Sequence, residues 1–491
     1  MKNTKLYTGI VLAVTAVMTL VSCGQDFIEV APINENSEDY FNTPEDYELA
    51  LVGAYDLLQA TYLNVLVGEI ASDNTLAGGE SATDTPGIQE IDNMTHTPVN
   101  QQLRDIWGWM FSGVNRANYI LEFQDKIDFD GKNEIIAQAR FLRAYYYFEL
   151  VKWFGDVPLA VDQRLLFGDQ FNVDRTPAAE VYAQIEQDLI YAAENLPATQ
   201  AQEGRITSGA ARALLGKAYL YQDKFTEAAN ALDQVIAGPY DLLDDYSILF
   251  LQEGENSVES VFEVQYTDKE GAGFGCLQCS EGNVAVGFNG IRNYSGPEFD
   301  SGFSFNVPVA EAYNAFEPGD TRQDNAILDI EAFAARTGAT YNEGYEHTGY
   351  FNRKYLPRKG DANLGDANLT NPNNYRSIRF ADVLLMAAEA HNRKANPNDV
   401  LAQEYLNRVR RRAFGDLDHD IVATSAALTE FIYAERRLEL VGEGHRFFDL
   451  VRTGRAADEI PGFTPDKNEL FPIPSIEIEL AGNRWEQNQG Y

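Results

Sequence analysis

Residues 205–240 read RITSGAARALLGKAYLYQDKFTEAANALDQVIAGPY, and this stretch decides the fold that we expect for the chain. Leu215, Gly216 and Tyr219 lie at the leucine–glycine–tyrosine spacing of a tetratricopeptide repeat. Ala228 falls where the second helix of such a repeat requires a small residue. The small residues indicate that two antiparallel helices touch there. One helix pair cannot bury its own apolar face, so neighbouring pairs must stack against it.

Helical periodicity continues on both sides of this repeat. Thr207 or Ser208 caps the first repeat helix, and Thr176 with Pro177 marks the start of the helix before it. The expected helices cover residues 44–67, 101–126, 132–154, 177–196, 377–395 and 399–414. The sequence therefore predicts stacked helical repeats over about residues 41–240 and 376–455.

Between residues 241 and 375 the composition and the periodicity of the sequence change. Helical periodicity fades, and glycine, asparagine, serine, proline and aromatic residues dominate. Residues 257–266 (SVESVFEVQY) predict a short strand. The aromatic content argues against disorder, and loops carried by a rigid scaffold are where binding sites concentrate. We therefore expect the ligand-binding region in this loop-rich insertion.

The start of the chain has the pattern of a bacterial lipoprotein signal. Lys2 and Lys5 precede an apolar run that is too short for a stable membrane span. The run ends in Leu-Val-Ser-Cys, which predicts cleavage before Cys23 and acylation of its sulfur. An ordinary signal with a chance cysteine is the alternative. The expected parts are a signal peptide at 1–22, a lipid-anchored leash at 23–40 and a folded body at 41–491, held at the membrane by lipid alone.

The chain is strongly acidic, with a formal net charge of -37. A surface of this charge argues against nucleic-acid binding and against docking on anionic lipid. It also disfavours a polyanionic ligand, unless a local basic patch overrides it.

Two cysteines remain after Cys23, and they form a CxxC pair, Cys276 and Cys279. Such a pair is a redox motif, half of a zinc site or a small local disulfide. Redox pairs begin a helix after a strand, whereas this pair lies in a glycine-rich loop, GAGFGCLQCSEGN. No second cysteine pair completes a zinc site. We therefore favour a disulfide that pins the loop.

Several segments resemble, in order along the chain, the SusD/RagB family of outer-membrane nutrient-binding lipoproteins. They are residues 107–121, 139–159, 378–390, 433–452 and 470–491. The resemblance implies an all-α fold: a right-handed superhelix of four tetratricopeptide-like helix pairs, with a loop-rich, mostly irregular ligand-binding region packed over it. It also implies a place on the cell outer membrane, lipid-anchored and facing outside.

The same resemblance implies a non-catalytic function. Members act as a lid that captures an oligosaccharide or polysaccharide and delivers it to a partner SusC-like TonB-dependent transporter, and RagB-like members suggest peptides as the alternative ligand. A surface glycosidase or peptidase would need a carboxylate pair or a nucleophile in a cleft. A pure repeat scaffold would not need the aromatic insertion. No cofactor is implied, although a structural calcium among the acidic loops stays open.

The expected helix at 435–452 gathers side chains that invite a catalytic or metal-binding interpretation. They are Glu435, Glu439, Glu443, His445 and Asp449. Arginines alternate with them at helical spacings, so we expect salt bridges and a structural role instead.

The resemblance implies that ligand contacts come from the insertion and from the loop before the tryptophan helix, here residues 71–100. That loop contains no Phe, Trp or Tyr, so an aromatic platform must come from the insertion. The candidate contacts are Tyr266, Phe274, Phe288, Arg292 and Tyr294, with Asp73 and Asn74 as polar partners. The alternative is that Arg292, Tyr294 and Pro297 shape the fold.

Overall fold

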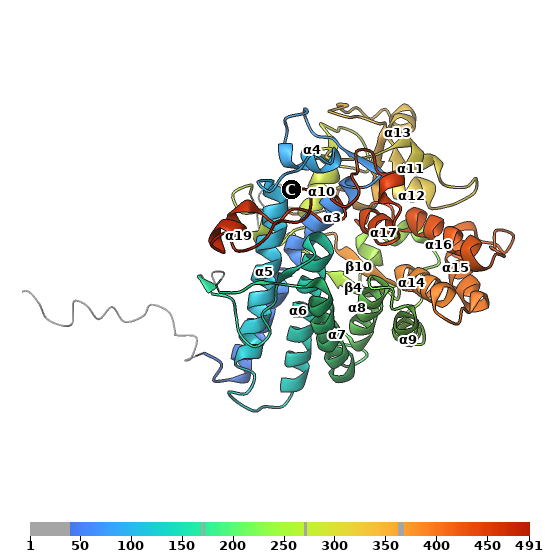
Figure 1. Cartoon of the computed structure of the whole chain (residues 1–491). Helices are drawn as coiled ribbons and strands as arrows, with labels where there is room; N and C mark the ends of the chain where they lie inside the picture. Colours follow the sequence, from blue (N-terminus) through green and yellow to red (C-terminus); the bar gives the residue numbers. More distant parts are fainter. Residues whose placement is uncertain (1–39, 167, 170–171, 270–272, 362–367) are drawn as a thin grey trace, which may run out of the picture.

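The computed structural model describes residues 40–166, 168–169, 172–269, 273–361 and 368–491. The expected signal peptide at 1–22, the acylated Cys23 and the leash up to residue 39 lie outside the described residues. Long helices form the lower part and the right flank of the molecule in Figure 1, and most of the loop-rich insertion, coloured from light green through yellow to light orange, lies above them.

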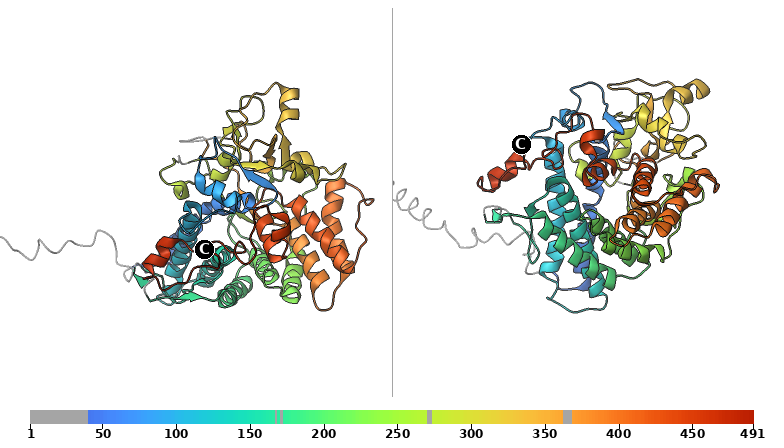
Figure 2. Two further views of the ribbon diagram at one scale, coloured as in Figure 1. Left: turned by 45° about the horizontal axis from the view of Figure 1, so that its top comes forward. Right: turned by 45° about the vertical axis from the view of Figure 1, so that its right-hand side comes forward.

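The scaffold consists of long helices that pack on their neighbours in sequence. α5 packs on α6, α6 on α7, α7 on α8 and α8 on α9, and α9 then packs on α14, which follows the whole insertion in sequence (Figures 1 and 2). Their bounds are α5 (Gln101–Glu122), α6 (Lys132–Phe154), α7 (Ala178–Asn195), α8 (Ser208–Leu220), α9 (Phe225–Ile236), α14 (Phe380–Arg393), α15 (Asp399–Phe414) and α16 (Ser425–Glu439). This arrangement confirms the all-α, tetratricopeptide-like fold.

The helix pair predicted from residues 205–240 is present. A Cβ at Gly216 would lie 2.5 Å from Leu232 Cγ on α9, so only glycine fits this contact without a shift. Ala228 is fully buried on the other helix. Thr207 caps α8, because its side chain accepts the backbone N–H of Ala210 at 3.2 Å.

Four of the expected helices have different boundaries, and the one expected at 101–126 ends at Glu122. The stretch 44–67 is divided into α2 (Pro44–Asp56), the 3-10 turn η3 (Gln59–Thr61) and α3 (Tyr62–Ile70). By length and composition Pro44–Ile70 is apolar enough to cross a membrane, but most of it is buried inside the protein. α7 begins at Ala178 with Pro177 as its cap, because Thr176 pairs with Val157 in a strand. The stretch 377–395 begins as a strand, because its first residues form a ladder with the insertion.

Short strand pairs brace the insertion. β4 (Ser260–Val264) pairs with β10 (Tyr375–Arg379), which confirms the strand predicted at 257–266. The other pairs in the described part are β1 (Thr75–Ala77) with β7 (Asn306–Pro308), β2 (Val157–Pro158) with β3 (Arg175–Thr176), β5 (Ile291–Arg292) with β6 (Ser301–Gly302), and β8 (Ile327–Asp329) with β9 (Tyr350–Asn352). The β1–β7 pair joins the first loop to the insertion, so the two regions expected to bind ligand lie together.

Small helices and turns fill the rest of the described chain. They are α4 (Pro86–Asp92), α10 (Val284–Asn289), α11 (Ala310–Asn314), α12 (Gln323–Ala326), α13 (Ile330–Thr337), α17 (Arg446–Arg452), α18 (Ala456–Glu459), α19 (Ser475–Leu480), η5 (Tyr246–Ile248), η6 (Gln252–Gly254), η7 (Leu277–Cys279) and η8 (Arg353–Tyr355). The insertion has a core of its own around Phe299 and Phe351, which are both fully buried. Its described part is therefore packed, although it has little regular structure.

Candidate functional site

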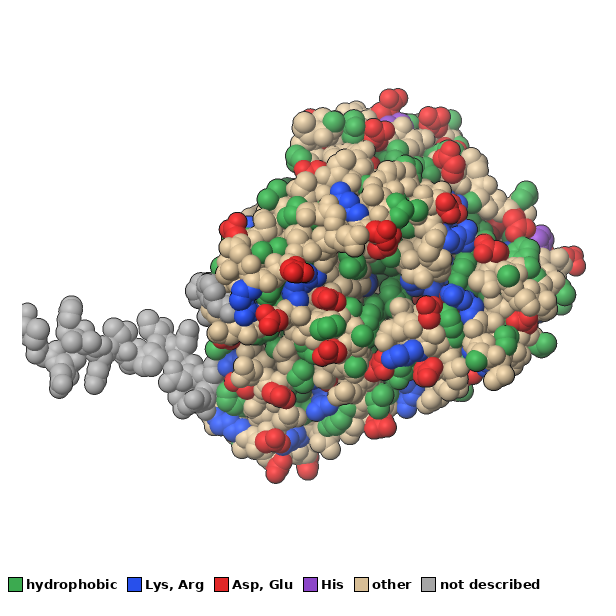
Figure 3. Space-filling view, viewed as in Figure 1, with side chains coloured by type: hydrophobic (Ala, Val, Ile, Leu, Met, Phe, Trp, Pro, Cys, Tyr) green, Lys and Arg blue, Asp and Glu red, His purple; other side chains and the backbone are tan. Residues whose placement is uncertain are grey.

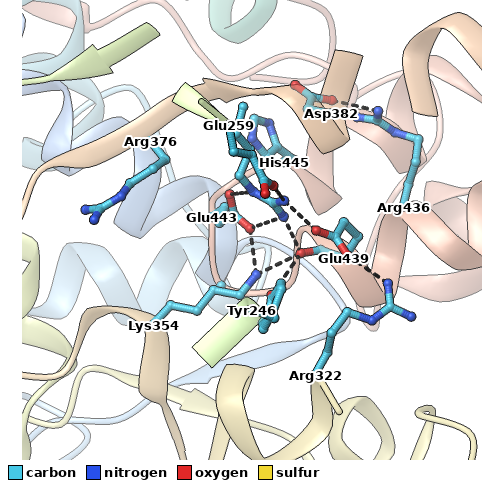
Figure 4. Close-up of polar contacts among 12 residues, drawn as sticks. Tyr246, Glu259, Arg322, Lys354, Arg376, Asp382, Arg436, Glu439, Glu443 and His445 are labelled. Atoms are coloured by element: carbon cyan, nitrogen blue, oxygen red, sulfur yellow. Dashed lines mark hydrogen bonds and ion pairs between the residues drawn. The ribbon is translucent and has the colours of Figure 1, made fainter. Parts of the chain in front are cut away.

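A group of buried charges joins β10, α15 and α16 to the insertion (Figure 4). We call it the ionic core, and its members are Glu259, Arg322, Lys354, Arg379, Arg412, Glu435, Glu439 and Glu443. Glu439 accepts hydrogen bonds from Arg322 at 2.8 Å and from Arg412 at 2.6 Å, and it also pairs with Arg379. Glu443 accepts from Arg379 at 2.8 Å and from Lys354 at 2.6 Å. Each carboxylate is therefore matched by cations from other elements.

The helix expected at 435–452 is broken in the middle. α16 ends at Glu439, and the chain then turns through Gly442 and Gly444, whose φ angles are 81° and 79°. Only glycine adopts such angles without strain. Glu443 and His445 therefore lie in the turn before α17 and not on a continuous helix. The expectation of one helix is wrong. Its carboxylates do form ion pairs, in agreement with a structural role, but Glu435, Glu439 and Glu443 pair with cations of other elements and not with arginines of the same segment.

The electrostatics of these groups do not suit acid–base chemistry. Burial alone would raise the pKa of Glu439, but Arg412, Arg379 and Arg322 hold it well below its ordinary value. Burial, with help from the nearby Lys217, lowers the pKa of His445 to about 3. A general acid or base works best with a pKa near the operating pH, and neither group meets that condition.

Two of the predicted polar contacts join these charged groups. Asp73 accepts from Arg446 at 2.7 Å and pairs with Arg437 at 3.1 Å. Asn74 is fully buried and accepts from Arg437 at 2.8 Å. As folded, their carboxylate and carbonyl oxygens are satisfied inside the protein, so their role as ligand contacts stays a prediction.

Three of the predicted aromatic contacts are packed inside the protein. Tyr266, Phe288 and Tyr294 are 8%, 8% and 7% exposed. The Tyr266 hydroxyl donates to the Gln59 carbonyl at 2.8 Å. The Tyr294 hydroxyl donates to the Pro297 carbonyl, which agrees with the alternative that these two residues shape the insertion. The fold corrects the expectation of an exposed platform at these three residues, because neighbouring side chains cover their rings.

Phe274 is the predicted aromatic residue that faces solvent, with 60% of its surface exposed. Its ring lies 5.7 Å from the ring of the half-buried Phe303, which contacts Phe288 in turn at 5.8 Å. Cys276 and Cys279 are joined by a disulfide two residues after Phe274, as we favoured. An exposed ring therefore rests on a row of phenylalanines that leads into the core.

Arg292 is connected to this row through the backbone of Phe303. It donates to the Phe303 carbonyl at 2.6 Å and to Ser304 Oγ at 3.1 Å, and it pairs with Asp84 of the first loop at 3.6 Å. Tyr345 reaches the same first loop, because its backbone N–H donates to the Gly79 carbonyl at 2.9 Å. We call Asp84, Phe274, Arg292, Phe303 and Tyr345 the loop surface. It combines aromatic rings with one cation and one carboxylate.

No group of three or more His, Cys, Asp or Glu side chains within the ranges that the structure covers is placed to hold a metal ion. Calcium also binds backbone and amide oxygens. The structural calcium that the acidic loops left open stays a prediction.

Comparison with known proteins decides the family. A solved structure described as a laminarin-binding SusD-like protein is 36% identical over 92% of this chain and 100% of its own, with a TM-score of 0.83. The chain belongs to the SusD family. The SusD family profile matches residues 309–491, and a profile described as starch-binding, associating with outer membrane, matches residues 26–220.

Other members resemble this SusD-family chain over nearly its whole length. SusD-like protein P2 of Formosa agariphila is 28% identical over 97% of this chain and 98% of its own. Surface glycan-binding protein A from Bacteroides thetaiotaomicron, solved in complex with laminarihexaose, is 29% identical over 91% and 100%, with a TM-score of 0.81. Membership in this family identifies the chain as a binding protein and not an enzyme. The description of the second profile indicates association with the outer membrane.

Sequence reasoning missed two members of the loop surface of this SusD-family protein, Phe303 and Tyr345. Neighbouring glycines would not have found them, because Gly344 precedes Tyr345 but Gly287 equally precedes the buried Phe288. Tyr266 and Phe288 were predicted because they lie in the aromatic-rich insertion, but both are buried in the core.

Proposed function

We propose that this protein captures a neutral polysaccharide of the laminarin kind on the loop surface and delivers it to a SusC-like TonB-dependent transporter. The observation that carries the proposal is the exposed ring of Phe274, which contacts Phe303, whose backbone carbonyl accepts from Arg292 of the Arg292–Asp84 pair. Relatives of similar length are described as binding laminarin or laminarihexaose.

The loop surface has the chemistry that a sugar chain requires. The C–H face of a pyranose ring stacks on an aromatic ring, and such a contact contributes about 1 kcal/mol. Arg292 donates hydrogen bonds to hydroxyl groups, and Asp84 accepts them, each with a net contribution of about 1 kcal/mol. A few contacts of this kind give micromolar to millimolar affinity. That range suits a protein that must release its ligand to a transporter.

The charge of the chain favours a neutral ligand. The net charge is -37, and acidic side chains are spread over the face in Figure 3 and are not confined to one patch. A polyanionic glycan would be repelled by this field. Within the loop surface, Arg292 is matched by Asp84, so it adds little net positive charge.

The proposal includes the attachment of the protein. Acylation of Cys23 after removal of residues 1–22 would anchor the chain in the outer membrane, with the body facing outside. Several acyl chains hold a protein at a bilayer stably. Labelling of intact cells with a membrane-impermeant reagent, compared between the wild type and Cys23→Ala, tests both the anchor and its orientation.

Native gels cast with laminarin, starch or an anionic polysaccharide test the proposed ligand, using residues 24–491. We expect slowed migration in a neutral glucan, and loss of that retardation in Phe274→Ala. Phe431→Ala is the matched control, because Phe431 is an exposed phenylalanine on α16, 43% accessible, outside the loop surface. Retardation that persists in Phe274→Ala would remove the loop surface from the proposal. Binding of peptides and of no glycan would favour the RagB-like alternative.

A further inference from the structure

The Cys276–Cys279 disulfide lies between an anchored end and an exposed tip of one loop. The anchored end is Ser280–Glu281, and the tip is Gly273–Gly275, which carries Phe274. The bond therefore links the part of the loop that is hydrogen-bonded to the body to the part that holds the exposed ring.

The anchored end is held by several hydrogen bonds. The Ser280 side chain is buried and donates to the Leu369 carbonyl at 2.7 Å. The Glu281 carbonyl accepts the backbone N–H of Thr267 at 2.7 Å and the Gln59 side-chain amide at 3.4 Å. Cys279 directly precedes Ser280, so one half of the disulfide is fixed to the body.

The tip has far fewer constraints. A Cβ added to Gly273 or Gly275 would meet no atom within 4 Å, so both flanking residues stand clear of the body. The Phe274 ring touches Phe303, and the Cys276 backbone N–H donates to the Gly273 carbonyl at 3.3 Å. Glycine has more backbone freedom than any other residue. Without the disulfide, the residues around Phe274 would have many conformations open to them.

We infer that the Cys276–Cys279 disulfide positions Phe274 for glycan binding. The inference rests on the proposed function of the loop surface. A ligand that binds a mobile loop must order it, and a covalent link that restricts the loop beforehand lowers that cost. The disulfide itself does not contact the ligand. It acts through Phe274 by limiting where the ring can lie.

Four proteins test the inference: wild type, Phe274→Ala, Cys276→Ser/Cys279→Ser, and the triple variant. Their dissociation constants for laminarin are measured by calorimetry, and their melting temperatures are measured alongside. We expect the serine variant to bind roughly two- to tenfold more weakly, a loss bounded by the contribution of the Phe274 ring itself. The triple variant should bind no more weakly than Phe274→Ala. Melting temperatures should stay close to that of the wild type, because the disulfide closes only a short surface loop.

Each contrary outcome has its own meaning. Full affinity in the serine variant, with a loss in Phe274→Ala, overturns the inference and leaves the proposed function standing. Additive losses in the triple variant overturn it too, because the disulfide then acts elsewhere. Full affinity in Phe274→Ala, or no binding by the wild type, overturns the proposed site or ligand. If the serine variant does not fold, wild type and Phe274→Ala are compared with and without a phosphine reductant, with the same expected pattern.

Discussion

The carboxylate of Glu69 accepts the backbone N–H of Gly442 at 2.9 Å. It also accepts the N–H of Gly444 at 3.0 Å, so one side chain of α3 holds the turn between α16 and α17. Glu69 is 1% exposed, and burial raises its pKa to about 7. The turn carries Glu443 of the ionic core, so the first helices of the chain and the charged centre are coupled through a carboxyl group that titrates near neutrality.

The raised pKa of Glu69 predicts a pH-dependent stability. The group has an ordinary pKa of 4.5, so below that value it is protonated in both the folded and the unfolded state. Between pH 4.5 and about 7 the unfolded state has lost this proton while the folded state keeps it, so stability falls across that range and levels off above it. Relative to Glu69→Gln, the free energy of unfolding of the wild type should fall by about 3 kcal/mol between pH 4.5 and about pH 8. Chemical denaturation measures it, and a difference that is constant with pH would contradict the prediction.

Two helical glycines should respond oppositely to the same change. Gly216→Ala places a Cβ 2.5 Å from Leu232 Cγ, so α8 and α9 must move apart, at a cost of about 1–3 kcal/mol. At Gly108 on α5 a Cβ meets no atom within 4 Å, so Gly108→Ala should stabilise the protein by up to about 1 kcal/mol. Thermal unfolding of both variants measures the contrast. Equal effects would mean that the repeat contact at Gly216 does not determine the helix spacing.

The ionic core should tolerate the loss of a cation poorly. Arg379 is 1% exposed and pairs with Glu259, Glu439 and Glu443. Arg379→Met leaves buried carboxylates short of a partner, which should cost about 3–5 kcal/mol. Arg411→Met is the control, because Arg411 pairs with Glu404 and Asp420 at the surface, where such pairs contribute less than about 1 kcal/mol. Denaturant titration compares the two, and a loss for Arg379→Met as small as the control's would remove the ionic core as a source of stability.

Much of the scaffold could be predicted from sequence because its signals are local. The helices at 132–154 and 399–414 have the predicted bounds, and each is followed by a glycine, Gly155 or Gly415, with a positive φ. The break at 440–445 was missed because Gly442 and Gly444 lie among residues of strong helical periodicity. Their turn depends on contacts with distant residues, since a Cβ at Gly442 would meet Asn352 and one at Gly444 would meet the backbone of Val65.

The binding surface was harder to predict because exposure is a tertiary property. Tyr266 and Phe274 lie in the same aromatic-rich insertion, yet the first hydroxyl donates to the carbonyl of Gln59, far away in sequence, and the second ring faces solvent. Asp73 looked available in a polar loop, but Arg446 reaches it from the other end of the chain. Composition located the region correctly, while the contacts between distant segments selected which of its side chains face outward.

Arg292 offers the sharpest test of ligand chemistry on the loop surface. Its guanidinium donates to the Phe303 carbonyl and pairs with Asp84, and its side chain is 16% exposed. Arg292→Met keeps the length of the side chain but removes its donors, so laminarin affinity should fall roughly five- to tenfold. Arg336→Met on α13 is the control, because Arg336 is exposed and lies over Phe333, away from these residues, and should bind normally. Unaltered affinity in Arg292→Met would exclude Arg292 as a contact.

The salt dependence of binding tests the charge of the ligand. If the ligand is neutral, the affinity of the wild type should change less than about twofold between low and high salt. A steep salt dependence would point to a charged ligand.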